Sequence, residues 1–211
     1  MPIRQQFPGC EFCFPDRNRI LFETDLFYAM LSLGPIAEGH SLLIAKSHYW
    51  CCAAVPQEEQ RQFLTAKQGL AELLKEEYGP CITFEHGRTA SCVDEEDGSP
   101  HETTLCFHAH LHIVPTSVDL FEDLKRYFVP LQCESWDEIV EFYERNEEYL
   151  LYEDQLGEMT VFPGRRLPQY FLRLLLASQL GFPEKASWRQ YKGFDVIKRS
   201  MLRLRDKALL H

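Results

Sequence analysis

The chain has 211 residues, enough for one domain or for a domain with a substantial additional segment. Hydrophobic residues make up 45% of it and aromatic residues 13%, a composition that excludes a disordered chain, and the net charge of −10 argues against a generic polyanion-binding surface. No apolar run approaches the roughly 20 residues that span a bilayer, and the N-terminus lacks a signal-peptide core. We therefore expect a soluble cytoplasmic protein with no membrane partner.

Two of the eight cysteines form the motif Cys10-Glu11-Phe12-Cys13. Without a secretory signal, this CxxC is better interpreted as a metal-binding or redox motif than as part of a disulfide framework. Two thiolates at this spacing can bind one tetrahedral zinc ion when further ligands come from elsewhere in the chain. The other six cysteines are expected to be buried and to pack as small hydrophobic residues.

The first half of the chain alternates short apolar runs with turn residues. Residues 20–22, 26–31 and 41–45 are predicted to form antiparallel strands. Residues 56–78 form the clearest helix, because their apolar residues recur at helical spacing and Gly79-Pro80 ends the pattern. A strand at about 81–84 follows, and the polar segment after it is either a lid or a solvated loop.

After Pro115 the pattern becomes mainly helical. Helices are predicted over 121–128, 136–149, 167–180 and 193–209, with a short hairpin over 150–160. Charge is uneven here: residues 119–160 hold 13 acidic and 3 basic residues, whereas 165–207 hold 11 basic and 3 acidic. Either the two segments neutralise each other, or part of the basic set faces a phosphate-bearing ligand.

Three histidines alternate with apolar residues just before Pro115. Because successive side chains of a strand point to opposite faces, His108, His110 and His112 are expected on one face of a sheet. Such a row can ligate a metal, act as a nucleophile or exchange protons near neutral pH. Three polar residues on a half-solvated strand would be the simpler interpretation, but a solvent face rarely selects three histidines in a row.

Residues 108–114 match the pattern His-φ-His-φ-His-φ-φ, where φ is apolar, and so resemble the histidine triad (HIT) superfamily. Residues 39–48 add Gly-His-x-Leu-φ-φ-x-Lys-x-His in the expected order. The resemblance implies an α+β fold, with an antiparallel sheet of about five strands and the 56–78 helix packed on it. We expect residues 1–117 to form a histidine triad domain with an N-terminal zinc clip, and 118–211 a mainly helical extension packed on it.

Zinc-bearing members of the superfamily, including the galactose-1-phosphate uridylyltransferases, complete the metal site with a CxxC, a later histidine and the first triad histidine. By this resemblance, Cys10, Cys13, His48 and His108 would bind a structural zinc with no open coordination position. The alternative is a free CxxC and an unliganded His48.

The resemblance also implies the chemistry. His110 would attack an α-phosphate to give a covalent nucleotidyl-histidine, His112 would contact the phosphoryl oxygens or assist the leaving group, and His108 would orient the site or bind zinc. The candidate substrate-binding groups are His40 and the backbone of residues 103–107, in particular Thr104 and Cys106.

Two departures from the family pattern alter the expected ribose and phosphate contacts. Many triad hydrolases have an Asp and an Asn before a proline where this chain reads Ser32-Leu33-Gly34-Pro35, and an Asn-x-Gly where it reads Glu85-His86-Gly87. The second sequence, with Cys106 just before the triad, is similar to a divergent branch that includes the CwfJ-type domains linked to RNA processing.

We therefore expect a hydrolase or nucleotidyltransferase for a nucleoside or dinucleoside polyphosphate conjugate, such as a diadenosine polyphosphate. One alternative is an RNA-processing or nucleic-acid-end protein, in which basic residues hold an extended polyphosphate or strand. Another is a non-catalytic nucleotide-binding module that kept the zinc clip. The oligomeric state is open. Two copies can pair their sheets in a homodimer, or the C-terminal half can cover that surface instead. In the nucleic-acid-end alternative, the basic residues that hold the polyphosphate or strand would be ones such as Arg165, Arg166, Arg173 and Arg189.

Overall fold

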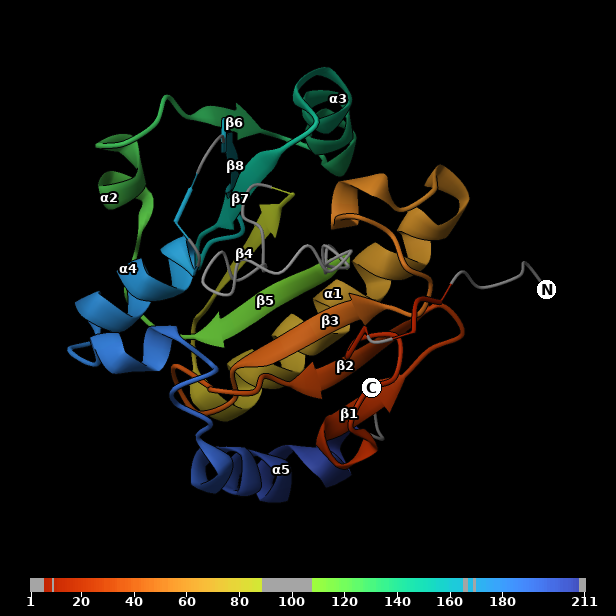
Figure 1. Cartoon of the computed structure of the whole chain (residues 1–211), viewed down its shortest axis with the longest axis vertical. Helices are drawn as coiled ribbons and strands as arrows, with labels where there is room; N and C mark the ends of the chain where they lie inside the picture. The colour runs from red at the N-terminus through yellow and green to blue at the C-terminus, as the bar shows by residue number, and fades with distance from the viewer. Residues whose placement is uncertain (1–5, 9, 89–107, 165–166, 169, 209–211) are drawn as a thin grey trace, which may run out of the picture.

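The computed structural model describes residues 6–8, 10–88, 108–164, 167–168 and 170–208 (Figure 1). Eight strands in this part of the chain form one antiparallel sheet in the order β1-β2-β3-β5-β4-β7-β8-β6. The strands are β1 (Ile20–Glu23), β2 (Phe27–Leu31), β3 (Ser41–Ala45), β4 (Cys81–Gly87), β5 (His110–Pro115), β6 (Leu131–Cys133), β7 (Tyr149–Glu153) and β8 (Met159–Phe162).

The α+β class and the antiparallel sheet are confirmed, but the expected number of about five strands is wrong. β6, β7 and β8 come from the segment after the triad and extend the same sheet through pairing of β7 with β4. The predicted hairpin over 150–160 is present as β7 and β8. The sequence did not reveal its partner, because β4 continues to Gly87, three residues beyond its predicted end, and so offers β7 a complete edge.

The helices follow the predicted order with shifted ends. α1 (Gln57–Tyr78) and α5 (Phe194–Ala208) agree closely with prediction, whereas α2 (Phe121–Lys125) and α3 (Trp136–Asn146) are shorter. α4 (Phe171–Gln179) begins later than predicted, since Tyr170 has a left-handed backbone, with φ of 60°. None of the helices in the described ranges combines the length and apolar character that a membrane crossing needs.

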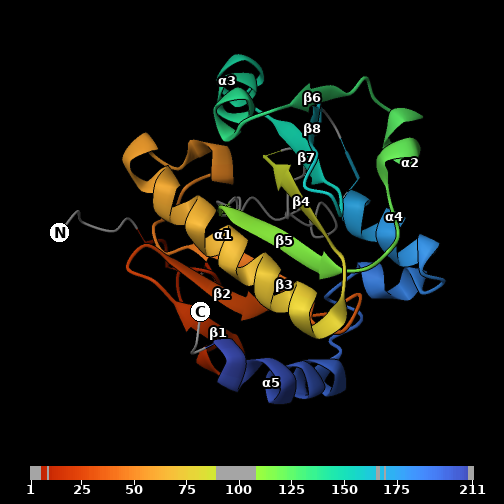
Figure 2. The ribbon, with the colours of Figure 1, turned by 180° about the vertical axis from the view of Figure 1, so that it is seen from behind.

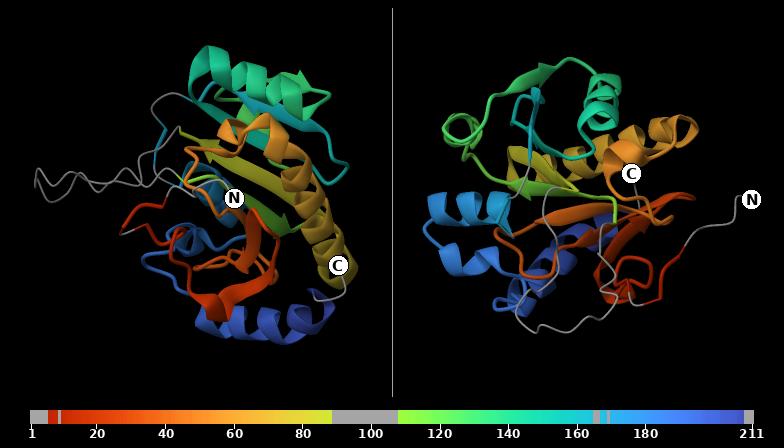
Figure 3. Two further views of the ribbon diagram at one scale, coloured as in Figure 1. Left: turned by 90° about the vertical axis from the view of Figure 1, so that its right-hand side faces the viewer. Right: turned by 45° about the horizontal axis from the view of Figure 1, so that its top comes forward.

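The helices cover both faces of the sheet. α1 runs across one face, as the reverse view shows, and packs with α3 and α5 over the apolar side chains that β5 directs there (Figures 2 and 3). On the opposite face, α2 and α4 pack on the half of the sheet formed by β4, β7 and β8. The even-numbered residues of β5 point to this second face, so α2 and α4 lie on the same side of the sheet as the triad, whereas α3 and α5 lie on the other side.

Candidate active site and metal centre

The triad occupies the centre of the sheet. β5 is flanked by β3 and β4, and its register pairs His110 with Ile44, and His112 with both Leu42 and Phe84. The ring of Phe84 stacks on that of His112, with 4.7 Å between centroids and 15° between planes. The expected row of imidazoles on one face is therefore present, and it continues across β4 to His86.

His110 is held with one nitrogen engaged and the other available. Its Nδ1 lies 2.6 Å from the carbonyl oxygen of His108, and since a carbonyl only accepts, Nδ1 carries the proton. The neutral ring therefore has its lone pair on Nε2. Burial lowers the pKa of His110 to about 4, although part of its surface is exposed, so the ring is neutral at physiological pH.

A chain of hydrogen bonds sets the tautomer of His112. The backbone N–H of Ile36 donates to Nδ1 of His40 at 3.2 Å, so the proton of neutral His40 is on Nε2. That Nε2 lies 2.9 Å from Nδ1 of His112, which therefore accepts. The remaining proton of His112 is on Nε2, ready to donate to a ligand. Burial holds the pKa values of both rings well below the usual range, which keeps them neutral.

Two neighbours of the row were not among the predicted site residues. The backbone N–H of Leu172, in the first turn of α4, donates to Nε2 of His86 at 3.2 Å. Burial lowers the pKa of His86 to about 3. The next residue, Arg173, is 3% exposed and places its positive charge near the row. The sequence signal for both was weak: His86 belongs to a motif that we interpreted only as a departure from the family, and Arg173 was one of several basic residues.

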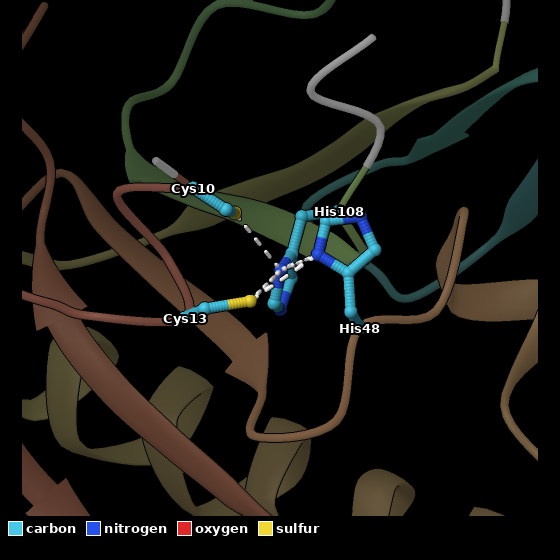
Figure 4. Close-up of side chains that lie close together, drawn as sticks. All are labelled: Cys10, Cys13, His48 and His108. Carbon is cyan, nitrogen blue, oxygen red and sulfur yellow. Dashed lines mark hydrogen bonds between the residues drawn. The ribbon is translucent and has the colours of Figure 1, made fainter. Parts of the chain in front are cut away.

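The four predicted metal ligands converge (Figure 4). The ligand atoms of Cys10, Cys13, His48 and His108 all lie within 4.8 Å of one another. His108 Nδ1 lies 3.0 Å from His48 Nδ1 and 3.4 Å from Cys10 Sγ, and His48 Nδ1 lies 3.3 Å from Cys13 Sγ. Tetrahedral zinc with nitrogen and sulfur ligands has edges of about 3.3–3.8 Å, so the separations suit such an ion.

The second nitrogen of His108 fits the same role. Its Nε2 lies 2.7 Å from the carbonyl oxygen of Ala45, so this nitrogen carries the proton and the lone pair on Nδ1 faces the cluster. A histidine that ligates a metal commonly donates its other N–H to a carbonyl or carboxylate in this way. The backbone carbonyl of His108 also orients His110, so His108 links the cluster to the centre of the triad.

The Glu85-His86-Gly87 departure from the family pattern has a structural explanation. Glu85 points to the face opposite the triad, where Cys52 N–H and the Tyr149 hydroxyl donate to its two carboxylate oxygens. A side chain on Gly87 would collide with the Tyr149 ring, at 2.2 Å from Cε1. Of the predicted substrate contacts, His40 lies in the site, whereas Thr104 and Cys106 lie outside the described residues, as do Arg165 and Arg166.

Comparison with known proteins agrees with this geometry. Residues 16–118 match the family model of the HIT domain. The match spans β1 to β5 and the whole triad, so this part of the chain carries a HIT domain. An uncharacterised HIT-like protein of Saccharolobus solfataricus is 29% identical over 131 residues, which cover 60% of this chain and 86% of that protein.

Parts of this chain are also similar to solved structures. A zinc-bound family member from Mycobacterium smegmatis is 26% identical, with a TM-score of 0.35, over 51% of this chain and 74% of its own. Yeast Ap4A phosphorylase Apa2, solved in complex with AMP, is 16% identical, with a TM-score of 0.45, over 72% of this chain and 62% of its own.

Proposed function

We propose that the protein transfers or hydrolyses the nucleotidyl group of a nucleoside or dinucleoside polyphosphate through a covalent intermediate on His110. The observation that carries the proposal is the hydrogen bond of His110 Nδ1 to the carbonyl of His108, which fixes an unprotonated Nε2 on a neutral imidazole. A nucleophile needs this lone pair in place before the substrate arrives, because turning or deprotonating the ring during the reaction would add to the barrier.

In the first step, Nε2 of His110 forms a bond to the α-phosphorus, and the bond from that phosphorus to the leaving-group oxygen breaks. The electron pair of the broken bond stays on the leaving oxygen. Nε2–H of His112 donates to a phosphoryl or leaving-group oxygen, since its other nitrogen is engaged by His40. Water in a hydrolase, or an acceptor phosphate in a transferase, then attacks the same phosphorus and releases His110.

We propose zinc for the cluster of Cys10, Cys13, His48 and His108. Two sulfur and two nitrogen ligands would fill a tetrahedral site, so the ion would have a structural role and would not contact the substrate. It would hold the N-terminal loop against the sheet and fix His108, whose carbonyl positions His110.

The test is covalent trapping. Purified protein is incubated with a panel of labelled nucleoside and dinucleoside polyphosphates, and an acid-labile protein adduct is sought by mass spectrometry. We expect an adduct on His110 and turnover in the wild type, and loss of both in His110→Ala. Gln132→Ala, an exposed change on β6, is the matched control for handling and folding.

Absence of adduct and turnover with every nucleotide in the panel would refute the enzyme proposal for small nucleotides. Retained binding without an adduct would instead support the non-catalytic module, and 5′-modified RNA would then test the nucleic-acid-end alternative. The cytoplasmic location and a homodimer remain predictions, as does the division near residue 117.

A further inference from the structure

Arg173 is a buried cation beside the active site. Its Nε donates to the carbonyl of Ala186 at 2.7 Å, and its Nη2 donates to the carbonyls of Gly34 and Lys185 at 2.5 and 3.1 Å. All three partners are neutral backbone groups. Within the described part of the chain, no carboxylate forms an ion pair with this guanidinium.

A buried charge without a counter-ion is costly, so its presence requires an explanation. Burial lowers the pKa of Arg173 to about 10, which still leaves the group charged at neutral pH. The three carbonyls offset part of the desolvation cost and tie α4 to the loop at Gly34. They do not neutralise the charge, and an anionic ligand that binds next to Arg173 would.

The first turn of α4 holds this residue near the histidine row. Leu172, the preceding residue, donates its backbone N–H to His86, and Arg173 contributes to the low pKa of that ring. The first turn of α4 therefore contacts β4 directly on the triad face. The partial positive charge of the helix N-terminus lies at the same place and also favours an anion.

The guanidinium is also tied to the loop that holds His40. Arg173 bonds to Gly34, and two residues later the N–H of Ile36 donates to His40, which in turn sets the tautomer of His112. The charge of Arg173 contributes to the low pKa of both imidazoles. It therefore lies at the His112 end of the row, opposite the end occupied by the metal-binding cluster.

We propose that Arg173 binds the anionic part of the leaving group beyond the α-phosphate, so that the site selects polyphosphate substrates over nucleotide conjugates with a neutral leaving group. The inference rests on the proposed function for the position of the α-phosphate at His110. His108 and the metal-binding cluster occupy one end of the histidine row. The phosphates beyond the α-phosphate therefore extend from His110 toward the other end, where His112 and Arg173 lie. Arg173 is then a specificity-determining residue, and its bonds to three carbonyls hold it ready before the substrate binds.

The first experiment compares two substrates. Values of kcat/KM are measured for a dinucleoside tetraphosphate and for a nucleoside 5′-phosphoramidate, whose leaving group is a neutral amine. We expect Arg173→Met to reduce kcat/KM for the tetraphosphate roughly 10- to 100-fold more than for the phosphoramidate, as removal of a charge-assisted contact does. Arg173→Lys keeps the charge but loses the forked bonds to the three carbonyls, so it should restore part of the preference, whereas a purely structural role would leave it no better than Arg173→Met.

A matched control removes an equal charge elsewhere. Arg145→Met changes an exposed arginine on α3 that pairs with Glu141, and it should leave both substrates unaffected. Equal losses for the two substrates in Arg173→Met, accompanied by a fall in Tm, would show that Arg173 only ties α4 to the sheet. That result would overturn the inference.

The second experiment does not depend on turnover. Binding of inorganic tripolyphosphate is measured by calorimetry for the wild type, Arg173→Met and Arg145→Met. Binding to the wild type that weakens roughly 10- to 100-fold only in Arg173→Met supports the inference even if no substrate is cleaved. In that case the failure lies in the proposed catalysis. Equal affinity in all three proteins, or no binding to the wild type, would overturn the role of Arg173.

Discussion

The two faces of the sheet bury polar side chains in different ways. On the triad face, His108, His110 and His112 each have one ring nitrogen bonded to a group of the protein, which fixes the tautomer and leaves the other nitrogen for a ligand. On the α1 face, Glu85 has both carboxylate oxygens occupied by donors of the protein.

This difference separates a site from a structural support. A buried polar group with all of its hydrogen bonds made stabilises one arrangement and offers nothing to a ligand. A polar side chain that keeps one donor or acceptor free, and that lies in a row with other such side chains, can bind a ligand. Glu85 and His86 are adjacent in sequence, and the alternation of β4 places one in each category.

The largest effect is expected on the triad face, when the metal is removed. A ligand present at 1,000 times its dissociation constant adds about 4 kcal/mol to the free energy of unfolding. A chelator should therefore lower the wild-type Tm strongly and leave Cys10→Ser unchanged, because that variant has already lost a ligand. Metal content is measured in parallel, and wild-type protein that contains no zinc and keeps its Tm in chelator would contradict the proposed centre.

The α1 face should respond to pH. Burial raises the pKa of Glu85 to about 7, from 4.5 in the ordinary state, so the folded protein holds an extra proton between these values. Stability therefore falls as pH rises from about 4.5 to 7, by up to about 3 kcal/mol for this group, and levels off above. The buried histidines of the triad face have lowered pKa values and act in the opposite direction, but they contribute equally to the wild type and to Glu85→Gln. Denaturant unfolding from pH 4.5 to 8 should therefore show the slope of Glu85 as the difference between the two proteins.

The matched control for this titration is Glu141→Gln, an exposed carboxylate on α3. It should reproduce the wild-type slope. Parallel pH profiles of the wild type and Glu85→Gln would mean that Glu85 is ionised in the folded protein throughout the range.

The attachment of the C-terminal segment depends on Gly34. This residue has φ of +64°, and a Cβ there would lie 2.5 Å from the Tyr191 carbonyl oxygen and 2.6 Å from Trp188 Cα. Gly34→Ala should lower the free energy of unfolding by about 2–3 kcal/mol, from left-handed strain and overpacking. Gly69→Ala on α1, with nothing within 4 Å of its Cβ, should instead add roughly 0.5–1 kcal/mol. Equal effects of the two changes in chemical denaturation would contradict this packing.

Sequence alone predicted the central part of the molecule, because there local pattern and long-range structure agree. The alternation of the triad predicted one face of β5, and the family pattern predicted the four cysteine and histidine side chains, from residues 10 to 108, that converge in the structure. It did not predict that β7 pairs with β4, since an apolar run such as Tyr149–Glu153 does not specify its partner. Nor did it predict the position of Arg173, which depends on how α4 returns across the sheet.

The smallest effect is expected from substitutions that distinguish the two hydrogen bonds of His40, one from Ile36 and one to His112. In His40→Gln, the side-chain amide can still donate to His112, but the bond from Ile36 is lost, and the expected cost is about 1 kcal/mol of unfolding free energy. Turnover should remain within a few-fold of wild type, because the tautomer of His112 is kept. His40→Leu has a similar volume and no donor, so it should slow turnover roughly 10- to 100-fold. Similar rates for the Gln and Leu variants would show that the proton on His112 Nε2 does not depend on His40, and the orientation of His112 would then rest on its stacking with Phe84.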